Sequence, residues 1–350
     1  MSANRRRFSR TRRLVYSLVA LAAAWLALEI VVAATGLYKR PSERVFTDVY
    51  DAAYELLPGV RVPFGNAPIP EDPTNHAGFR GPEFSDTKPE GVFRVICVGD
   101  STTFGVMVPE PETYARRLEK SLHAKAPRVE VLNAGVPGTN IFAHRVLLAK
   151  TLLPLKPDVI VLYVLFNGRP EVEDIRRKIE GGRAANRVQL ALRHSAVYRL
   201  LRRLLKGGFA LDSDAPLAHL VADSGVPGGW VETSFRADLH AVVDQVQHAG
   251  AKLVLVYHLT RPGVQARLDR RANPALPLGA SERFNRRLRG LTRDAAATRG
   301  VVFLDPMPAF VRGKSEDKQL FLDDVHFSSH GHAVLAEELT EPLGKLLGAP

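Results

Sequence analysis

The sequence has a single cysteine, Cys97, among its 350 residues, so no disulfide bond can form within the chain. The cysteine count therefore does not decide between an oxidising and a reducing compartment. Aromatic residues make up only 7% of the chain, and no basic stretch is interleaved with them as in a nucleic-acid groove. We therefore expect no nucleic-acid partner. A chain of this length without an internal repeat can hold one large domain with appendages, or two small domains.

The net charge of +11 is unevenly distributed. Six arginines lie within the first 13 residues and account for more than half of it: Arg5, Arg6, Arg7, Arg10, Arg12 and Arg13. Most of the remaining excess lies in residues 189–206, where apolar residues recur at helical intervals between arginines. This pattern predicts an amphipathic basic helix, which could lie on a membrane surface, cover an active site or present a solvated face.

One long apolar run, residues 14–37, is sufficient to cross a bilayer. The arginines before it predict that residues 1–13 form a cytoplasmic basic tail, and that the chain after residue 38 lies outside the cytoplasm, periplasmic or extracellular. A cleaved signal peptide is the alternative, but its apolar region is usually only about 7–15 residues long. Glu29 lies past the middle of the run, where it can be protonated or reach the far interface. The sequence therefore predicts a single-pass transmembrane anchor.

Beyond the anchor, residues 38–90 read as a linker and lead-in segment, since prolines interrupt most of it. Residues 91–350 alternate short apolar strands with amphipathic helices, apart from a helical insertion at 169–231. Expected strands cover 95–98, 129–132, 158–166, 253–257 and 301–304, and expected helices cover 114–124, 140–153, 233–247, 281–298 and 331–347. This alternation predicts an α/β domain with a five-stranded parallel sheet between two helical layers.

The first expected strand stops at Gly99 and is followed by Asp100 and Ser101. Ligands of open parallel sheets bind beyond the carboxyl ends of the strands, so Ser101 lies where chemistry is expected. A serine there could equally be a helix cap. Only a base and an oxyanion hole elsewhere in the chain favour a nucleophile over a cap.

Three later stretches supply such groups. Asp323 and His326 lie three residues apart in one loop, and a carboxylate-oriented histidine is the usual base for a serine nucleophile. The glycine-rich loop with Gly138 and the strand end at Asn167 supply donors for a developing oxyanion, beside the amide of Ser101.

The stretches Gly99-Asp100-Ser101, Gly138, Asn167 and Asp323-x-x-His326 resemble the four blocks of the GDSL/SGNH hydrolase superfamily, over about residues 75–347. The phrase Gly78-Phe79-Arg80-Gly81 is similar to its membrane-anchored bacterial branch. The resemblance implies a flavodoxin-like three-layer α/β/α sandwich and ester hydrolysis through an acyl-serine. It also implies that Ser101 is the nucleophile, His326 the base and Asp323 its orienting acid, with Ser101, Gly138 and Asn167 as the oxyanion hole.

Several alternatives stay open beside this resemblance. The family often has Gly-x-Asn-Asp where this chain has Leu165-Phe166-Asn167-Gly168, and Glu171, Glu173 or Asp174 could replace the missing acid. Asp324 is a second candidate for the orienting acid. His326, His330 and His332 with two aspartates could hold a metal, but Gly331-His332 fits better as the start of a helix, so we expect neither a metal nor a cofactor. His258 reads as a residue of the site wall and Asp100 as a brace of the turn. The turn-rich loop at 75–83 could pack Phe79 on the sheet edge, or Arg80 could reach the mouth of the site.

We therefore expect a membrane-tethered extracytoplasmic serine esterase that acts on a small or medium acyl group. Glycan-linked and lipid-linked esters are its candidate substrates. An O-acyltransferase that passes the acyl group to an envelope glycan is the alternative, because it would use the same triad. A non-catalytic binding module is a third hypothesis, which an intact Ser101, His326 and Asp323 disfavours.

Overall fold

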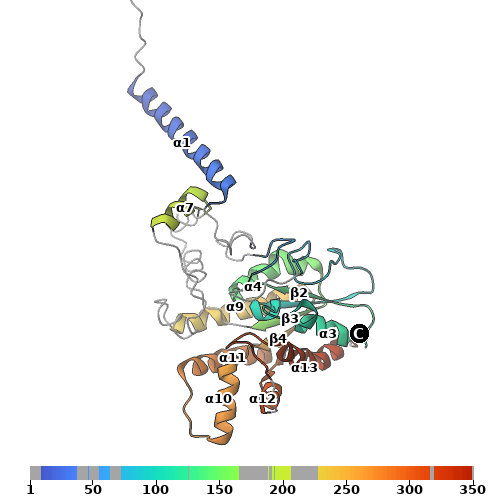
Figure 1. The fold of residues 1–350 in the computed structure, drawn as a ribbon. Helices are drawn as coiled ribbons and strands as arrows, with labels where there is room; N and C mark the ends of the chain where they lie inside the picture. Colours follow the sequence, from blue (N-terminus) through green and yellow to red (C-terminus); the bar gives the residue numbers. More distant parts are fainter. Residues whose placement is uncertain are drawn as a thin grey trace, which may run out of the picture. The chain divides into compact units, whose positions relative to one another are not determined.

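The structure is a computed structural model and is shown as a ribbon in Figure 1. It describes residues 9–37, 46, 55–63, 72–124, 126–164, 188, 191–192, 194–205, 228–315 and 319–348. The chain divides into two compact units. One unit draws on Met1–Arg44 and Ile175–Ser213, and the other on Val45–Asp174 and Asp214–Pro350.

The first unit contains α1 (Arg10–Thr35) and α7 (Ala196–Leu205). Ser9 caps α1 and Gly36 ends it in the left-handed conformation. The helix is long and apolar enough to cross a membrane, although a signal sequence would pass the same test. The predicted apolar segment thus forms one helix.

The second unit is built on a parallel sheet whose strand order is β2-β1-β3-β4-β5, the flavodoxin-like order. Its strands are β1 (Phe93–Gly99), β2 (Val129–Gly135), β3 (Val159–Val164), β4 (Lys252–Tyr257) and β5 (Val302–Leu304). In the register, Gly99 lies beside Gly135 and Val98 beside Leu162. The central strand β1 therefore ends between two neighbours, with Ser101 just beyond it.

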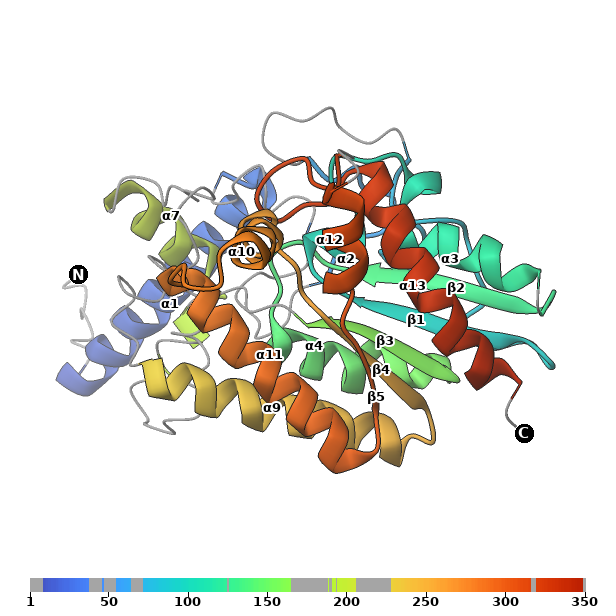
Figure 2. The ribbon, with the colours of Figure 1, turned by 90° about the horizontal axis from the view of Figure 1, so that it is seen from below.

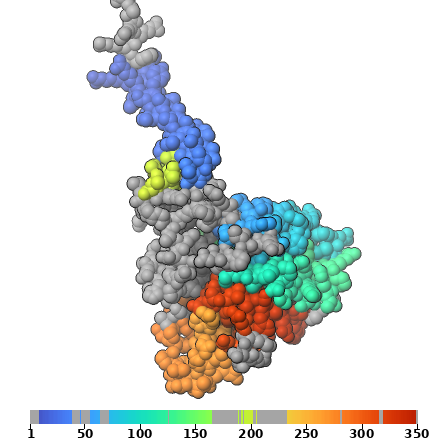
Figure 3. All heavy atoms as spheres, in the orientation of Figure 1, coloured from blue at the N-terminus to red at the C-terminus, as the bar shows by residue number. Residues whose placement is uncertain are grey.

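Helices cover both faces of this sheet. One face carries α4 (Ile141–Leu147), α9 (Gly228–His248) and α11 (Ala280–Arg299), and the other carries α3 (Tyr114–His123), α10 (Arg261–Ala272), α12 (Met307–Ser315) and α13 (Ser329–Leu347). Figure 2 shows the sheet between these layers, and Figure 3 shows the C-terminal segment against the segment around α3. This arrangement confirms the predicted three-layer α/β/α sandwich.

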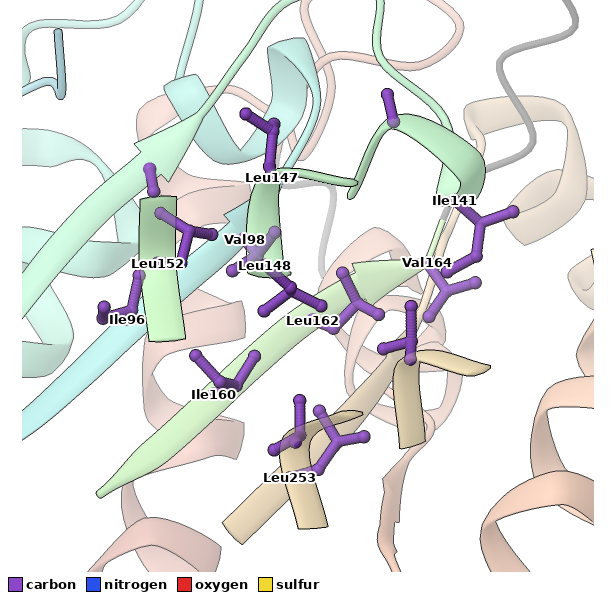
Figure 4. Close-up of a cluster of buried hydrophobic side chains, with 14 of the residues drawn as sticks. Ile96, Val98, Ile141, Leu147, Leu148, Leu152, Ile160, Leu162, Val164 and Leu253 are labelled. Atoms are coloured by element: carbon purple, nitrogen blue, oxygen red, sulfur yellow. The ribbon is translucent and has the colours of Figure 1, made fainter. Parts of the chain in front are cut away.

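Alternate residues of β1 enter opposite cores, as the two-residue period of a strand requires. Ile96 and Val98 pack with the α4 and α9 side, whereas Val95 and Cys97 pack with the α3 and α13 side. All four are fully buried, which explains why this strand is a continuous apolar run. Figure 4 shows Ile96 and Val98 beside Ile160 and Leu162 of β3.

The described elements differ from the predicted ones mainly at their ends. Ser281 was predicted to cap a helix, but α11 begins earlier, after Gly279, without a side-chain cap. The predicted helix over 140–153 is shorter, because α4 ends at Leu147 and continues as a π-helical turn (Leu148–Leu152) and a 3-10 turn (Leu153–Leu155). Helices α10 and α12 were not predicted. Residues 165–187 and 206–227, most of the predicted insertion, lie outside the described residues.

The turn that carries Ser101 is pressed against the end of β2. A Cβ atom on Gly135 would lie 2.2 Å from the backbone nitrogen of Phe104 in α2 (Ser101–Phe104). We therefore expect Gly135→Ala to lower the free energy of unfolding by roughly 3 kcal/mol and to impair any activity of Ser101. Urea unfolding of the full chain measures the first effect.

The matched control is Gly290→Ala in α11, where an added Cβ meets no atom within 4 Å. Replacing a glycine inside a helix by alanine is expected to stabilise the chain by up to about 1 kcal/mol. A Gly135→Ala protein as stable as the wild type would contradict the close packing of α2 on β2.

Candidate active site

Ser101 is the first residue of α2, directly after the central strand. Asp100 caps this helix, since its Oδ1 accepts a hydrogen bond of 2.9 Å from the Thr102 amide. The amides of Gly105 and Val106 both donate to the Ser101 carbonyl, at 3.0 and 3.1 Å, and so close the turn. The Ser101 side chain is therefore held at the carboxyl edge of the sheet rather than serving as the cap itself.

His326 comes from the loop before α13 and reaches the serine. Its Nε2 lies 2.9 Å from Ser101 Oγ. The loop is fixed on both sides of the histidine: the amide of Leu322 donates to the His326 carbonyl, and Phe327 is fully buried between aromatic rings. The imidazole therefore has a defined position against the serine.

Asp323 binds the other ring nitrogen. Its Oδ2 lies 2.6 Å from His326 Nδ1, and its Oδ1 accepts the amides of Val325 and His326. Partial burial raises the pKa of Asp323, but the hydrogen bonds from the His326 side chain and from these two amides outweigh it and lower the pKa to about 2. The carboxylate is therefore charged at neutral pH.

Asp324, the alternative acid, points elsewhere. Its side chain is 64% exposed and pairs with Arg261 at 2.6 Å. The structure thus brings Ser101, His326 and Asp323 together in one hydrogen-bonded chain and leaves Asp324 at the surface.

Of the three predicted oxyanion donors, two can be placed. Within the described residues, no hydrogen bond is donated by the backbone amides of Ser101 and Gly138. Gly138 has a φ of 82°, which disfavours other residues, and its loop is tied to β1 because the Val136 amide donates to the Gly99 carbonyl at 2.9 Å. Asn167 lies outside the described residues.

Two residues that the sequence analysis missed brace this loop. Thr139 Oγ1 donates to the Val136 carbonyl at 2.7 Å and lies 2.9 Å from His144 Nε2. His144 is fully buried, and burial lowers its pKa to about 4. A histidine inside an amphipathic helix gives no sequence signal for this role.

The buried His144 makes stability depend on pH. Because folding lowers the pKa of His144, the unfolded chain binds a proton that the folded chain does not. The free energy of unfolding therefore decreases as the pH is lowered below the ordinary histidine pKa. Replacing His144 by glutamine removes this contribution. The difference in free energy of unfolding between wild type and His144→Gln should therefore change by about 1.4 kcal/mol per pH unit between about pH 6 and 4.5. Urea unfolding at several pH values measures it, and parallel curves would contradict it.

His258 follows β4 at the same edge of the sheet and is 5% exposed. Neither ring nitrogen forms a hydrogen bond with the described chain, and Tyr163 meets the ring edge-on at 5.4 Å. Burial, helped by the charge of His326, lowers the pKa of His258 to about 3. A neutral ring at this position does not compete for the proton that His326 would carry.

Arg80 does not lie at the surface of the site but beneath the turn. It is 3% exposed and donates to the carbonyls of Phe104, Gly105 and Val108. Burial lowers its pKa to about 10, so it remains charged. The preceding Phe79 is buried in the apolar cluster that covers one face of β1 and β2, as the packing interpretation of this loop predicted, and it also stacks on Phe84. Arg80 therefore braces the segment that follows Ser101.

Arg80→Met leaves three carbonyls without their donor. We expect a fall of about 3 kcal/mol in the free energy of unfolding, together with a lower kcat on any ester that Ser101 cleaves. Urea unfolding and steady-state kinetics measure the two effects. Arg293→Met is the control, because Arg293 is 66% exposed and pairs with the exposed Asp294. Equal effects of the two substitutions would contradict the bracing role.

The histidines considered as metal ligands have other surroundings. His332 is 1% exposed, accepts the Tyr114 amide at its Nδ1 and stacks on the Tyr114 ring. Among the residues that the structure describes, no three His, Cys, Asp or Glu side chains are grouped so as to hold a metal ion.

Comparison with protein families matches residues 97–334 to the GDSL-like Lipase/Acylhydrolase family. A search of curated proteins found no match. Solved structures with similar folds include an acetyl xylan esterase (16% identity, 72% of this chain and 100% of that chain, TM-score 0.46). They also include a catalytic mutant of an acetylxylan esterase from Geobacillus stearothermophilus (15% identity, 74% of this chain and 95% of that chain, TM-score 0.45). A lipolytic protein of the G-D-S-L family from Veillonella parvula is a third (13% identity, 71% of this chain and 97% of that chain, TM-score 0.44). None reaches a TM-score of 0.5, so they leave the substrate open.

Proposed function

The chain belongs to the GDSL-like lipase/acylhydrolase family and is a serine hydrolase of the esterase type; from this premise we propose that it is a membrane-tethered esterase that works outside the cytoplasm. The observation that carries the chemical part is the hydrogen-bonded chain from Ser101 Oγ through His326 to Asp323. In this proposal Ser101 is the nucleophile, His326 the general base and Asp323 the acid that orients it.

The first half of the reaction acylates Ser101. His326 Nε2 takes the hydroxyl proton while Ser101 Oγ attacks the ester carbonyl. Asp323, with its pKa of about 2, keeps its charge and stabilises the imidazolium that forms. The amides of Ser101 and Gly138, which donate to no group of the described chain, are free to donate to the oxyanion, and Asn167 is proposed as the third donor. Collapse of the intermediate expels the alcohol, which takes the proton from His326.

The second half releases the acyl group. Water attacks the acyl-serine, His326 accepts its proton, and the acid leaves as Ser101 Oγ is reprotonated. A sugar hydroxyl in place of water would transfer the acyl group instead. The two outcomes share every residue above and differ only in the acceptor.

We place the enzyme at the cell membrane because of α1. Residues 1–13 would form the cytoplasmic tail, 14–37 the anchor, 38–90 the lead-in and 91–350 the hydrolase domain. The basic residues before α1 and the apolar length of the helix support this orientation. We propose small or medium acyl esters linked to a glycan or a lipid as the substrate class.

The test is hydrolysis of p-nitrophenyl esters of rising acyl length by the full chain in detergent, with labelling by a fluorophosphonate. Turnover that is highest for acetyl or butyryl and labelling at Ser101 would support the proposal. Absence of both would favour a binding module. Transfer to an added oligosaccharide that outpaces hydrolysis would identify an acyltransferase.

The location has a separate test. Alkaline phosphatase fused after residue 40 is active only outside the cytoplasm, so an active fusion is expected. An inactive fusion would reverse the proposed orientation without touching the chemistry.

A further inference from the structure

Glu29 is the one acidic residue of α1, and it lies in the part of the helix that follows the arginines and is mostly apolar. The first unit shows what it binds. Ser195 Oγ donates to Glu29 Oε2 at 2.7 Å, the Val197 amide donates to the same oxygen at 3.2 Å, and the Ala196 amide donates to Oε1. These groups are the N-terminal end of α7. The carboxylate therefore accepts the donors that a helix leaves unpaired at its start.

A small apolar contact accompanies this link. Val32, one turn after Glu29 in α1, packs with Ala196 and Val197, and all three are at least 94% buried. Leu200 packs against the same cluster. Figure 3 shows α7 against the end of α1. Helix α7 is therefore fixed to α1 by polar and apolar contacts at the same point.

The rest of α7 combines exposed leucines with arginines. Leu201 is 47% and Leu204 71% exposed. The sequence of α7 contains Arg199, Arg202 and Arg203 and no acidic residue. Helices that lie in the headgroup region of a membrane typically combine large apolar residues with positively charged ones, as α7 does.

The depth of the contact agrees with that location. Glu29 lies six residues before the end of α1, which corresponds to about 9 Å along a helix. Interfacial helices bury their apolar face about 5–10 Å into the boundary between headgroups and acyl chains. A helix fixed to α1 at Glu29 therefore lies where such helices lie, provided that α1 spans the bilayer.

We propose that α7 is an interfacial helix that binds an anionic phospholipid surface, with Glu29 as the residue that fixes it to the anchor. In this proposal Leu201 and Leu204 enter the acyl boundary, and the net positive charge of the α7 sequence favours anionic headgroups. The inference rests on the proposed membrane anchor but not on the esterase chemistry. It also accounts for Glu29, because a carboxylate is tolerated near hydrocarbon when its oxygens accept hydrogen bonds.

The test uses the full chain in nanodiscs that contain either neutral lipid alone or neutral lipid with about 30% phosphatidylglycerol. The native Cys97 is fully buried, so an introduced cysteine can be labelled selectively with a fluorophore. Leu204→Cys reports on α7, Leu18→Cys on α1 and Lys345→Cys on the exposed surface of α13. Lipids with a spin label near the glycerol quench a fluorophore that lies in the interface.

We expect quenching at position 204 at least threefold stronger than at position 345, and stronger with phosphatidylglycerol than without it. Glu29→Leu should lower the quenching at 204 at least twofold and leave that at 18 unchanged. Lipids with a spin label deep in the acyl chains should quench the label at position 18. If they do, but the label at 204 is quenched no more than that at 345, the interfacial helix alone is overturned. An unquenched label at 18 would overturn the anchor and the inference together, whereas ester hydrolysis tests the chemistry separately.

Discussion

The Ser101→Ala protein is expected to hydrolyse p-nitrophenyl acetate about 10⁶-fold more slowly than the wild type, by comparison with the serine of a typical triad. The substitution removes the only atom that could form the acyl-serine. The oxyanion donors and the positions of His326 and Asp323 are expected to remain, so some rate above that in water should persist. Steady-state kinetics of the full chain in detergent measures the loss, and fluorophosphonate labelling should vanish with it.

The matched control is Ser121→Ala. Ser121 is an exposed serine in α3, and alanine is a good helix former, so neither activity nor folding should change measurably. Turnover that survives Ser101→Ala would remove Ser101 as the nucleophile. An equal loss in both variants would point to damage unrelated to the site.

Much of this site could be predicted because its residues follow strands that are unambiguous in the sequence. The run Val95–Val98 is apolar because both of its faces are buried, and its end at Gly99 fixes where Ser101 lies. His326 is 225 residues away, yet it reaches the same edge because its loop precedes a helix that packs against α3. Sheet topology, rather than local sequence, brings the two together.

The supporting residues could not be predicted for the opposite reason. Arg80 and His144 are polar residues whose partners are backbone carbonyls or a threonine hydroxyl in other segments. A carbonyl acceptor is the same for every residue type, so the sequence does not record which one an arginine binds. The prediction that Ser281 caps a helix was wrong because the helix already begins at Ala280. Serine is a good cap residue, but the sequence alone does not fix the first residue of a helix.

Asp323→Asn is expected to lower kcat about 10⁴-fold while the fold is kept. The asparagine oxygen can still accept the amides of Val325 and His326, but its NH₂ group would face His326 Nδ1 as a donor. The imidazole would then carry its proton on Nε2, where it could not accept the proton of Ser101. Steady-state kinetics on p-nitrophenyl acetate measures the loss.

The neighbouring Asp324→Asn is the matched control for this prediction. It makes the same chemical change one residue away, on a side chain that pairs with Arg261 at the surface, so kcat should change less than about threefold. A large loss in Asp324→Asn with little in Asp323→Asn would exchange the roles of the two acids.

Stability provides a second readout of the same pair. Folding lowers the pKa of Asp323 to about 2, so its contribution is fully present above the ordinary aspartate pKa of about 3.9 and is lost as the pH falls toward 2. The side chain is 44% exposed, so after screening by solvent Asp323→Asn should cost only about 1 kcal/mol at pH 7. A loss of that size cannot account for a 10⁴-fold fall in kcat. A fall of that order in a protein that still unfolds cooperatively would therefore reflect the altered orientation and charge of His326 rather than a damaged fold.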